Sequence, residues 1–600
     1  MYKILSLICI IAAAVTAFFL ASWIKSRRGS GDDTVRLYGI IKSRNSNFWA
    51  FHYIPVIAFT VLIALAAGAG IDWIHAAACL AGSIISFLAV YAGSAAFVPG
   101  SVSSYSQADA GDIRTSIRAS YRSGAVLGLC ISALVTAVLL AAFQFLKTET
   151  VMGLAGSFAM GASVVAVILH TGGDVYSSAY ALAVPSGDFT DRTGFFTGAG
   201  SDIAETYILS AAAVIMLADA GVAASGVTST FTNGAASRFV LVIYAAGIAG
   251  CVVGVFLQKA GIGNDPSRGA DIGLIAAGII ATAVCSYFSN VMLQSFVYTV
   301  AVGSGILAGI ILMEISRFFS PDSKIFKGVG KNLGKYAPAV FNMGRGMVST
   351  AVTAVLLIAA IGVSYSFAGY YGLALCAAGL ASMTAAASAL TSLSVISAQT
   401  SEILSSALAD SEEPEREKMS DAVDVVADRN GIMSKTYRTA AGFMSAFALF
   451  CAFAVTSQLE SMDIMALKVF AGIIVGICSA FAITGIIVGS VNVTGRVARR
   501  DMGRSDDETG STSSIRGAAM PAVIAIAFPA LIGLLSGPAS LAGFLVAVIS
   551  TSLFIVTGFN NSGRYLENTA IQSLASVVKL MTVFSVAFLP VFIEVGGFLF

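Results

Sequence analysis

The sequence predicts an all-α protein that crosses a membrane many times. Of its 600 residues, 57% are hydrophobic and 11% are charged, and the mean hydropathy is +0.86. Apolar runs of about 20 residues recur along the chain, which is the length that an α-helix needs to cross the hydrocarbon core. The runs lack the alternation of polar and apolar residues that outer-membrane strands show. The 60 glycines suit close packing between such helices.

Sixteen apolar runs qualify as membrane spans, and together they predict one integral-membrane domain over residues 1–600. The runs are 4–24, 53–72, 76–98, 123–146, 151–170, 205–225, 237–257, 270–288, 290–313, 347–369, 371–394, 438–457, 465–490, 518–536, 539–558 and 575–598. The first run is long, and Lys25, Arg27 and Arg28 follow it, so we expect a retained span rather than a cleaved signal peptide.

Lysine and arginine gather in alternate loops, as the positive-inside rule requires of cytoplasmic segments. The basic loops follow the first, third, seventh, ninth and thirteenth spans. The loops on the other side offer little beyond Lys147, Arg238 and Lys468. We therefore expect both termini outside the cytoplasm and all the long loops within it.

Two carboxylates stand at the mouth of the sixth span. Asp202 and Glu205 are three residues apart, so a helix would present both on one face. Lys579 interrupts the last apolar run and is a candidate partner. Ionisable groups at such depth are costly and usually mark an ion path, although a structural ion pair between two helices remains the alternative.

A second set of acids lies in the long loop before the twelfth span. Asp421, Asp424 and Asp428 are spaced three and four apart and precede Lys435, so a helix would stack them on one face. Stacked carboxylates followed by a lysine suit Mg²⁺ and phosphate, whereas a solvated charged surface is the other interpretation. The eight cysteines are scattered without the spacing of metal ligands, and nothing in the chain suggests a nucleic-acid partner.

Three segments resemble motifs of one family, the membrane-integral, ion-translocating inorganic pyrophosphatases. Residues 420–435 (SDAVDVVADRNGIMSK) are similar to the family's TDALDAVGNTTAAxGK, residues 200–207 (GSDIAETY) to GADLFESY, and residues 573–581 (SLASVVKLM) to SLNILIKLM. The resemblance implies two concentric rings of helices, a homodimer in the lipid bilayer, and hydrolysis of pyrophosphate with Mg²⁺ that drives H⁺ or Na⁺ across the membrane. A prokaryotic plasma membrane is the expected location.

The resemblance also implies roles for individual residues. Its ion gate would consist of Asp202, Glu205 and Lys579, with His170 at the position of the family's gate arginine. Its substrate and Mg²⁺ site would use Asp421, Asp424, Asp428, Lys435 and Asn560, together with Asp191 as the catalytic and metal-binding residue. The cytoplasmic substrate side would be built from loops 171–204, 395–437 and 559–573.

The hydrolytic motifs depart from the family pattern. A phosphate-facing lysine corresponds to Ser178, and of three aspartates in the next motif only Asp191 remains. Both aspartates of a further motif are missing from residues 391–399 (TSLSVISAQ). Each charge-assisted contact to such an anion is worth roughly 1.5–3 kcal/mol, so the loss of several predicts a poorly assembled site.

Two hypotheses follow for the activity. One is a divergent pyrophosphate-driven pump with a reduced Mg²⁺–pyrophosphate site. The other, which we prefer, is a hydrolysis-deficient homologue that keeps the gate as an ion pathway or binds another ligand. An unrelated secondary transporter is disfavoured because no inverted repeat is evident. The transported ion and any dependence on potassium stay open.

Overall fold

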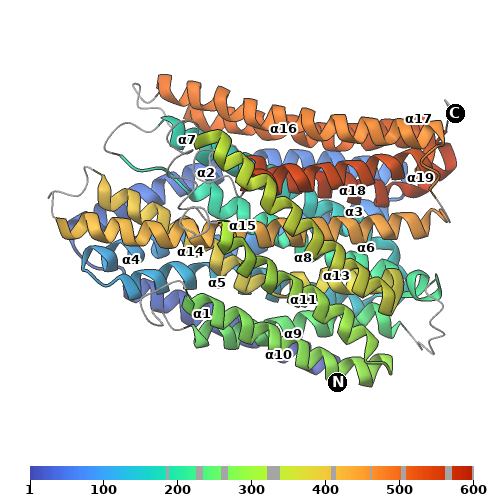
Figure 1. The fold of residues 1–600 in the computed structure, drawn as a ribbon, viewed down its shortest axis with the longest axis horizontal. Coiled ribbons are helices and arrows are strands. Elements are labelled where there is room, and N and C mark those ends of the chain that lie inside the picture. Colours follow the sequence, from blue (N-terminus) through green and yellow to red (C-terminus); the bar gives the residue numbers. More distant parts are fainter. Residues whose placement is uncertain are drawn as a thin grey trace.

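The protein is a bundle of long helices that run roughly along one axis (Figure 1). A computed structural model describes residues 1–183, 188–224, 234–258, 268–319, 338–406, 414–459, 462–501, 508–560 and 570–597. Throughout these residues the regular secondary structure is helical, without any strand. The all-α membrane fold predicted from the apolar runs is therefore confirmed.

The first half of the chain builds helices on both sides of the bundle's centre. Its elements are α1 (Tyr2–Ser26), α2 (Asp32–Gly70), α3 (Trp73–Ser94), α4 (Phe97–Asp109), α5 (Ile113–Phe145), α6 (Thr148–Ala166), the π-helix η1 (Val167–Thr171), α7 (Gly172–Ala183), α8 (Thr193–Ala224), α9 (Ala235–Leu257), α10 (Arg268–Leu293), α11 (Val297–Ser316) and the 3₁₀ turn η2 (Arg317–Phe319).

The second half adds longer helices. Its elements are α13 (Pro338–Ser382), α14 (Thr384–Ser405), α15 (Pro414–Thr456), α16 (Leu467–Asp501), α17 (Glu508–Asn560), the 3₁₀ turn η4 (Ile571–Ser573), α18 (Leu574–Ala587) and α19 (Leu589–Val595). Helices α16 and α17 lie side by side along one edge of the bundle, far from α1 and α10 (Figure 1).

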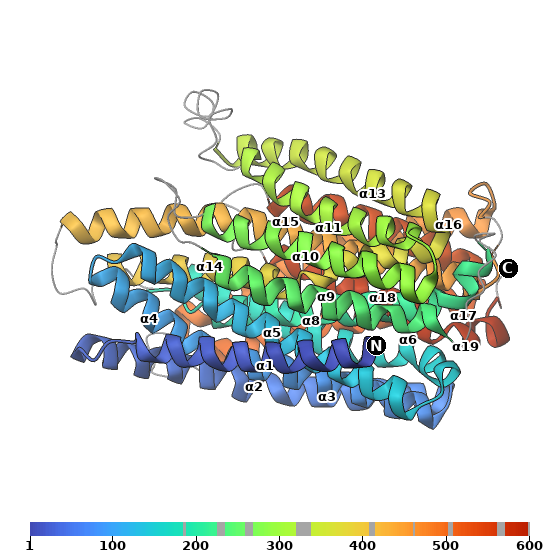
Figure 2. The ribbon, with the colours of Figure 1, turned by 90° about the horizontal axis from the view of Figure 1, so that it is seen from below.

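The described helices are numerous enough for a polytopic membrane protein. Thirteen are long and apolar enough to cross a membrane, or 14 if the bent pair Ile571–Ala587 and Leu589–Val595, which meet at 57°, forms one span. Helix α1 begins toward the same end of the bundle as α19 (Figures 1 and 2), in keeping with an even number of spans. Which side of the membrane that end faces stays a prediction.

Two of the long helices contain a break in the backbone. Helix α13 is non-helical at Ala368 and Gly369, and α17 is non-helical at Gly537, where φ is 79°. Both glycines adopt positive φ, a conformation that residues with a Cβ rarely take. The first break falls at the end of the tenth predicted span, and the second falls between the fourteenth and the fifteenth. Division at the breaks would bring 14 spans to sixteen, a number that remains a prediction.

Burial separates an inner set of helices from an outer set. Nearly every residue of α8 and α18 that the structure describes is buried, and α14 is buried along most of its length. By contrast, only about a third of the most apolar stretch is buried in α1, α2 and α16. The inner helices therefore form the centre of the bundle, and the outer ones present apolar side chains such as Phe18 and Ile358 to lipid.

The three predicted substrate loops are more regular than expected. Residues 171–183 and 193–204 are helical, as are 395–405 and 414–437, and in the third segment the described residues include the turn η4. In these stretches the long helices continue past the spans that hydropathy marks, and the assignment of the three segments to a cytoplasmic substrate side stays a prediction. The remaining parts, 184–187, 407–413 and 561–569, lie outside the described residues.

Candidate functional site

Glycines allow η1 and α7 to approach α8 closely. A Cβ atom on Gly173 would lie 2.5 Å from the main-chain oxygen of Gly194, nearer than real Cβ atoms come. A Cβ atom on Gly198 would lie 3.2 Å from the Cα of His170. The contact brings His170 beside Asp202, with 4.0 Å between the Nδ1 and Oδ1 atoms. The π-helix, a feature common at functional sites, holds His170 at this crossing.

Lys579 of α18 joins the two carboxylates of α8. Its Nζ atom lies 2.7 Å from Oδ1 of Asp202 and 2.7 Å from Oε2 of Glu205. The same ammonium group donates a hydrogen bond to Oγ1 of Thr206 at 3.0 Å. All these side chains are buried. Nζ also lies 3.2 Å from the main-chain oxygen of Asp202, so four oxygen atoms surround the three protons of this ammonium group.

Arg438 of α15 supplies a second fixed positive charge. Its Nε atom donates to Oδ2 of Asp202 at 2.9 Å, and the Nη2 atom lies 3.0 Å from Nε2 of His170. The side chain is buried, although 236 residues separate it from Asp202 along the chain. The resemblance implies an arginine at the position of His170; in the structure the guanidinium beside Asp202 comes from α15. We call Asp202, Glu205, Lys579, His170 and Arg438 the gate cluster.

Hydrogen bonding fixes the form of the His170 ring. A guanidinium has only donors, so Nε2 of His170 must accept the bond from Arg438. The proton then resides on Nδ1, which lies 2.9 Å from Oγ of Ser576. In this arrangement the His170 ring lies between the guanidinium of Arg438 and the hydroxyl of Ser576.

Glu205 belongs to the gate cluster through an ion pair alone. Both of its carboxylate oxygens are buried and accept no hydrogen bond within the described part of the chain; Oε2 lies 2.7 Å from Nζ of Lys579, whereas Oε1 has no charged partner. Ser163 of α6 lies beside the carboxylate. A buried carboxylate oxygen without a partner is costly, so this atom is a natural place for a proton, a water or a small cation.

Asp174 and Lys435 continue the chain of charges from the gate cluster toward the substrate side. Oδ2 of Asp174 lies 3.5 Å from Nε2 of His170, one helical turn away, and the carboxylate is buried. Lys435 of α15 interacts electrostatically with Asp174 and is half-buried. Asp174 is thus linked through His170 to Asp202, and Asp202 is linked through Lys579 to Glu205.

Asp191 is the remaining carboxylate of the expected catalytic motif, and it is fully engaged. Oδ2 accepts a hydrogen bond from the hydroxyl of Tyr176 at 2.8 Å. Oδ1 accepts from the main-chain nitrogen of Thr193 at 3.0 Å and from its hydroxyl at 2.7 Å. The side chain is completely buried at the start of α8. Asp191 therefore caps this helix, as short acidic side chains commonly do.

The segment around Asp191 is held by two further ion pairs. Arg44 of α2 lies 3.1 Å from Asp188, and Arg192 lies 2.5 Å from Glu402 of α14. Oε2 of Glu402 also accepts from the main-chain nitrogen of Thr190 at 2.9 Å. Arg44 and Arg192 are therefore paired with carboxylates of the protein itself. A phosphate site would instead need cations that face the ligand.

The acids expected from spacing do share one helix. Asp421, Asp424, Asp428 and Lys435 all lie on α15, and Asp421 is exposed whereas the other three are half-buried and have interaction partners. Asn560, at the end of α17, donates to Oγ1 of Thr439 on α15 at 2.8 Å. We call Asp191, these α15 residues and Asn560 the substrate end. No contact between Asp191 and the α15 acids is present in the described residues.

The substrate end does not present a set of ligands suited to Mg²⁺. Among the described residues, no three His, Cys, Asp or Glu side chains are grouped so as to hold a metal ion. Asp191 could turn toward an ion only by giving up three hydrogen bonds. Mg²⁺ prefers an octahedron of oxygen ligands, so these residues do not fit the site that the resemblance implies.

Sequence reasoning missed Arg438 and Asp174. With His170 at the position where the resemblance implies an arginine, Arg438 is the guanidinium that contacts Asp202. A signal was present, since Arg438 is the first residue of the predicted twelfth span and lies three residues after Lys435. Arginine is common at the boundary of a span, so its position alone does not indicate a role inside the bundle.

Comparisons with known proteins relate the chain to one family. A family model described as Inorganic H⁺ pyrophosphatase matches residues 11–185 and 183–502. A protein of Clostridium tetani named as a putative K⁺-stimulated pyrophosphate-energized sodium pump is 23% identical, over 100% of this chain and 99% of its own length. A K⁺-insensitive pyrophosphate-energized proton pump of Methanosarcina mazei is also 23% identical, over 93% of this chain and 89% of its own.

The two kinds of comparison cover different parts of the chain. The family model ends before Asn560 and Lys579, whereas the alignment with the Clostridium tetani protein includes them. A third relative, a proton pump of Moorella thermoacetica, is 23% identical over 76% of this chain and 75% of its own length. With more than half of its residues matched by the family model, the chain belongs to the inorganic H⁺ pyrophosphatase family.

Proposed function

We propose that this protein is a gated membrane pathway for a small cation, H⁺ or Na⁺, that does not hydrolyse pyrophosphate in the manner of its family. One observation carries the proposal. Lys579 lies 2.7 Å from both carboxylates of α8, while Asp191 is bound to Tyr176 and Thr193. The charges needed for gating are assembled, and the charges needed for hydrolysis are missing or engaged.

The geometry supports a simple gating step. Lys579 places a fixed positive charge in the centre of the bundle, which repels a cation that approaches along the same path. A proton or Na⁺ that reaches Glu205 would compete with Lys579 for its carboxylate. Lys579 would then remain paired with Asp202 alone, which Arg438 holds from the other side. The arrival of a cation at Glu205 would therefore change which carboxylate Lys579 is paired with.

A reduced pyrophosphate-driven pump is the second candidate. It is favoured by the alignment of the whole chain with a protein named as a pyrophosphate-energized sodium pump. Under this candidate, Asp421, Asp424, Asp428 and Lys435 would have to bind Mg²⁺ and pyrophosphate without the help of Asp191. A prokaryotic plasma membrane and a homodimer are further proposals, supported by the bacterial and archaeal relatives and by the family resemblance respectively.

Reconstitution into sealed vesicles distinguishes the two candidates. H⁺ and Na⁺ flux are measured with and without Mg²⁺-pyrophosphate, and phosphate release is measured in the same samples. We expect no phosphate release and a flux that ignores pyrophosphate, with Lys579→Ala raising the leak and the exposed Lys468→Ala leaving it unchanged. A pyrophosphate-dependent gradient, at protein levels where the Methanosarcina mazei relative builds one, would refute the proposal.

A further inference from the structure

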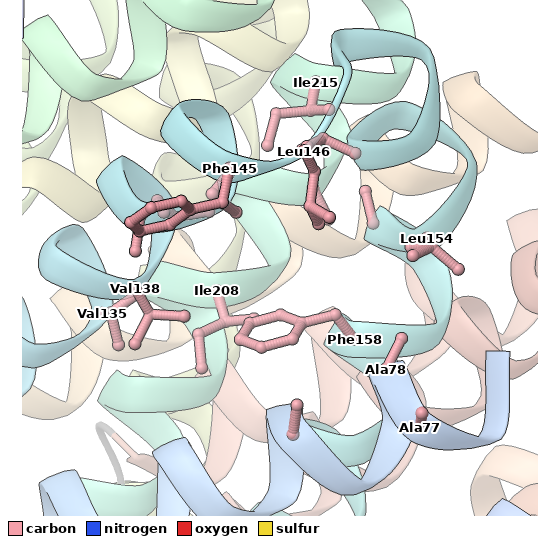
Figure 3. Close-up of a pocket in the computed structure, with 18 of the residues that line it drawn as sticks. Ala77, Ala78, Val135, Val138, Phe145, Leu146, Leu154, Phe158, Ile208 and Ile215 are labelled. Atoms are coloured by element: carbon pink, nitrogen blue, oxygen red, sulfur yellow. The ribbon is translucent and has the colours of Figure 1, made fainter. Parts of the chain in front are cut away.

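An apolar groove is open to the membrane between four helices of the bundle. Its cavity of about 460 Å³ is lined only by Ala, Val, Leu, Ile and Phe side chains from α3, α5, α6 and α8, with Leu146 just after α5. Figure 3 shows Phe145, Leu154, Phe158 and Ile208 around one common space. The groove is separate from the gate cluster, and the proposed function does not use it.

The floor of the groove belongs to α8, the helix that carries the gate carboxylates. Ile208, Ala211, Ala212 and Ile215 have the spacing of one helical face and are buried. Ile208 follows Glu205 by three residues, so the floor begins less than one turn from the gate cluster. If nothing filled the groove, few side chains would separate α8 from the surrounding lipid.

The mouth of the groove combines exposed apolar side chains with positive charge. Phe145 is 85% exposed, and Lys147, also exposed, follows the lining residue Leu146. Arg238 donates to Oγ1 of Thr148, and Lys3 donates to Oε1 of Gln144, so two more cations reach the same turn. Basic residues are scarce in the loops at this end of the bundle, yet Lys147 and Arg238 are together here.

We propose that the groove binds one acyl chain of an anionic phospholipid, with its phosphate at Lys147 and Arg238. The lining helices are membrane spans, so lipid tails are the apolar molecules that reach the opening. The half-buried guanidinium of Arg238 is held at Thr148, two residues after the lining residue Leu146, and guanidinium groups suit phosphate oxygens. The tail would complete the wall beside α8.

Native mass spectrometry of the detergent-solubilised full-length protein tests the site. Phosphatidylglycerol and phosphatidylcholine with the same acyl chains are added, and the retained lipid is counted at rising collision energy. We expect preferential retention of phosphatidylglycerol. Lys147→Gln should weaken it about fivefold, the effect of one lysine near an anionic headgroup. Lys468→Gln, a change of an exposed lysine in another short loop, should have no effect.

A second set of variants changes the groove itself, either by filling it or by removing a side chain at its mouth. Ala78→Phe places a ring among the lining residues and should abolish retention, whereas Ala58→Phe on the exposed face of α2 should not. Phe145→Ala removes a side chain that is almost fully exposed, so it tests the mouth in a variant that folds normally. It should also lower retention.

Three outcomes would overturn the proposal. Equal retention of phosphatidylglycerol by Ala78→Phe and Ala58→Phe would show that the groove is not the binding site. Equal retention of the two lipids by the unmodified protein would remove the role of the headgroup charge. Loss of a dimer in Ala78→Phe, without any lipid bound to the unmodified protein, would assign the groove to a second copy of the chain.

Discussion

The gate cluster and the substrate end both hold carboxylates and basic side chains, but these groups have different partners. In the gate cluster, Asp202 contacts Lys579 and Arg438 at 2.7 and 2.9 Å, deep inside the bundle. At the substrate end, Asp191 is engaged by neutral hydroxyl and amide groups, and Asp421 faces solvent. Buried carboxylates opposite buried cations are the groups on which the proposed gating depends. Charge opposite neutral donors creates a stable helix end.

Loss of Lys579 gives the largest expected effect. Lys579→Ala leaves two buried carboxylates without their shared cation, and such a loss costs about 3–5 kcal/mol. We expect a large fall in the midpoint of thermal unfolding together with a raised ion leak. Lys468→Ala is the control for general loss of a lysine, because Lys468 is exposed. A variant as stable as the unmodified protein would show that Asp202 and Glu205 do not depend on Lys579.

Whether Arg438 supplies the positive charge expected at position 170 can be tested by exchanging the residues at these two positions. Arg438→Ala should cost about 2–5 kcal/mol, since it removes one partner of a buried, hydrogen-bonded charge pair. His170→Arg alone should also destabilise, because two guanidinium groups would then share one space.

The double variant His170→Arg with Arg438→Ala should recover part of the lost stability and of the ion selectivity. A double-mutant cycle in thermal unfolding measures the coupling directly. Additive losses would mean that Arg438 and the histidine position do not supply the same charge.

The substrate end should respond to substitutions as a structural element. Asp191→Asn keeps an acceptor for Thr193 but changes the bond to Tyr176, so we expect a loss of about 1–3 kcal/mol. The loss should be the same with and without Mg²⁺. If instead Mg²⁺ stabilises the unmodified protein and Asp191→Asn abolishes that gain, the residue is a metal ligand and the contrast between the two regions fails.

Asp421→Asn gives the smallest expected effect. The side chain is exposed at the first turns of α15, and surface substitutions usually change the free energy of unfolding by within about 0.5 kcal/mol. Thermal unfolding and ion flux should both match those of the unmodified protein. A marked change in flux would show that the acidic face of α15 takes part in ion entry.

Local sequence was sufficient for much of this molecule. A run of about 20 apolar residues must bury its backbone polar groups as a helix wherever it lies in the membrane, so the fold class follows from hydropathy alone. The spacing of Asp202 and Glu205 places both on one face of α8 without knowledge of any other helix. Motifs identified Lys579 as their candidate partner, since three separate segments resembled one family.

Only tertiary structure decided which charges meet. Arg438 contacts Asp202 because α15 packs against α8 at one rotation, and hydropathy carries no information about helix rotation. The engagement of Asp191 likewise depends on Tyr176 from α7, and the groove is formed by side chains that four separate helices, α3, α5, α6 and α8, bring together. Ion pairs and cavities depend on side-chain positions to within about an ångström, so they form only when the helices have packed.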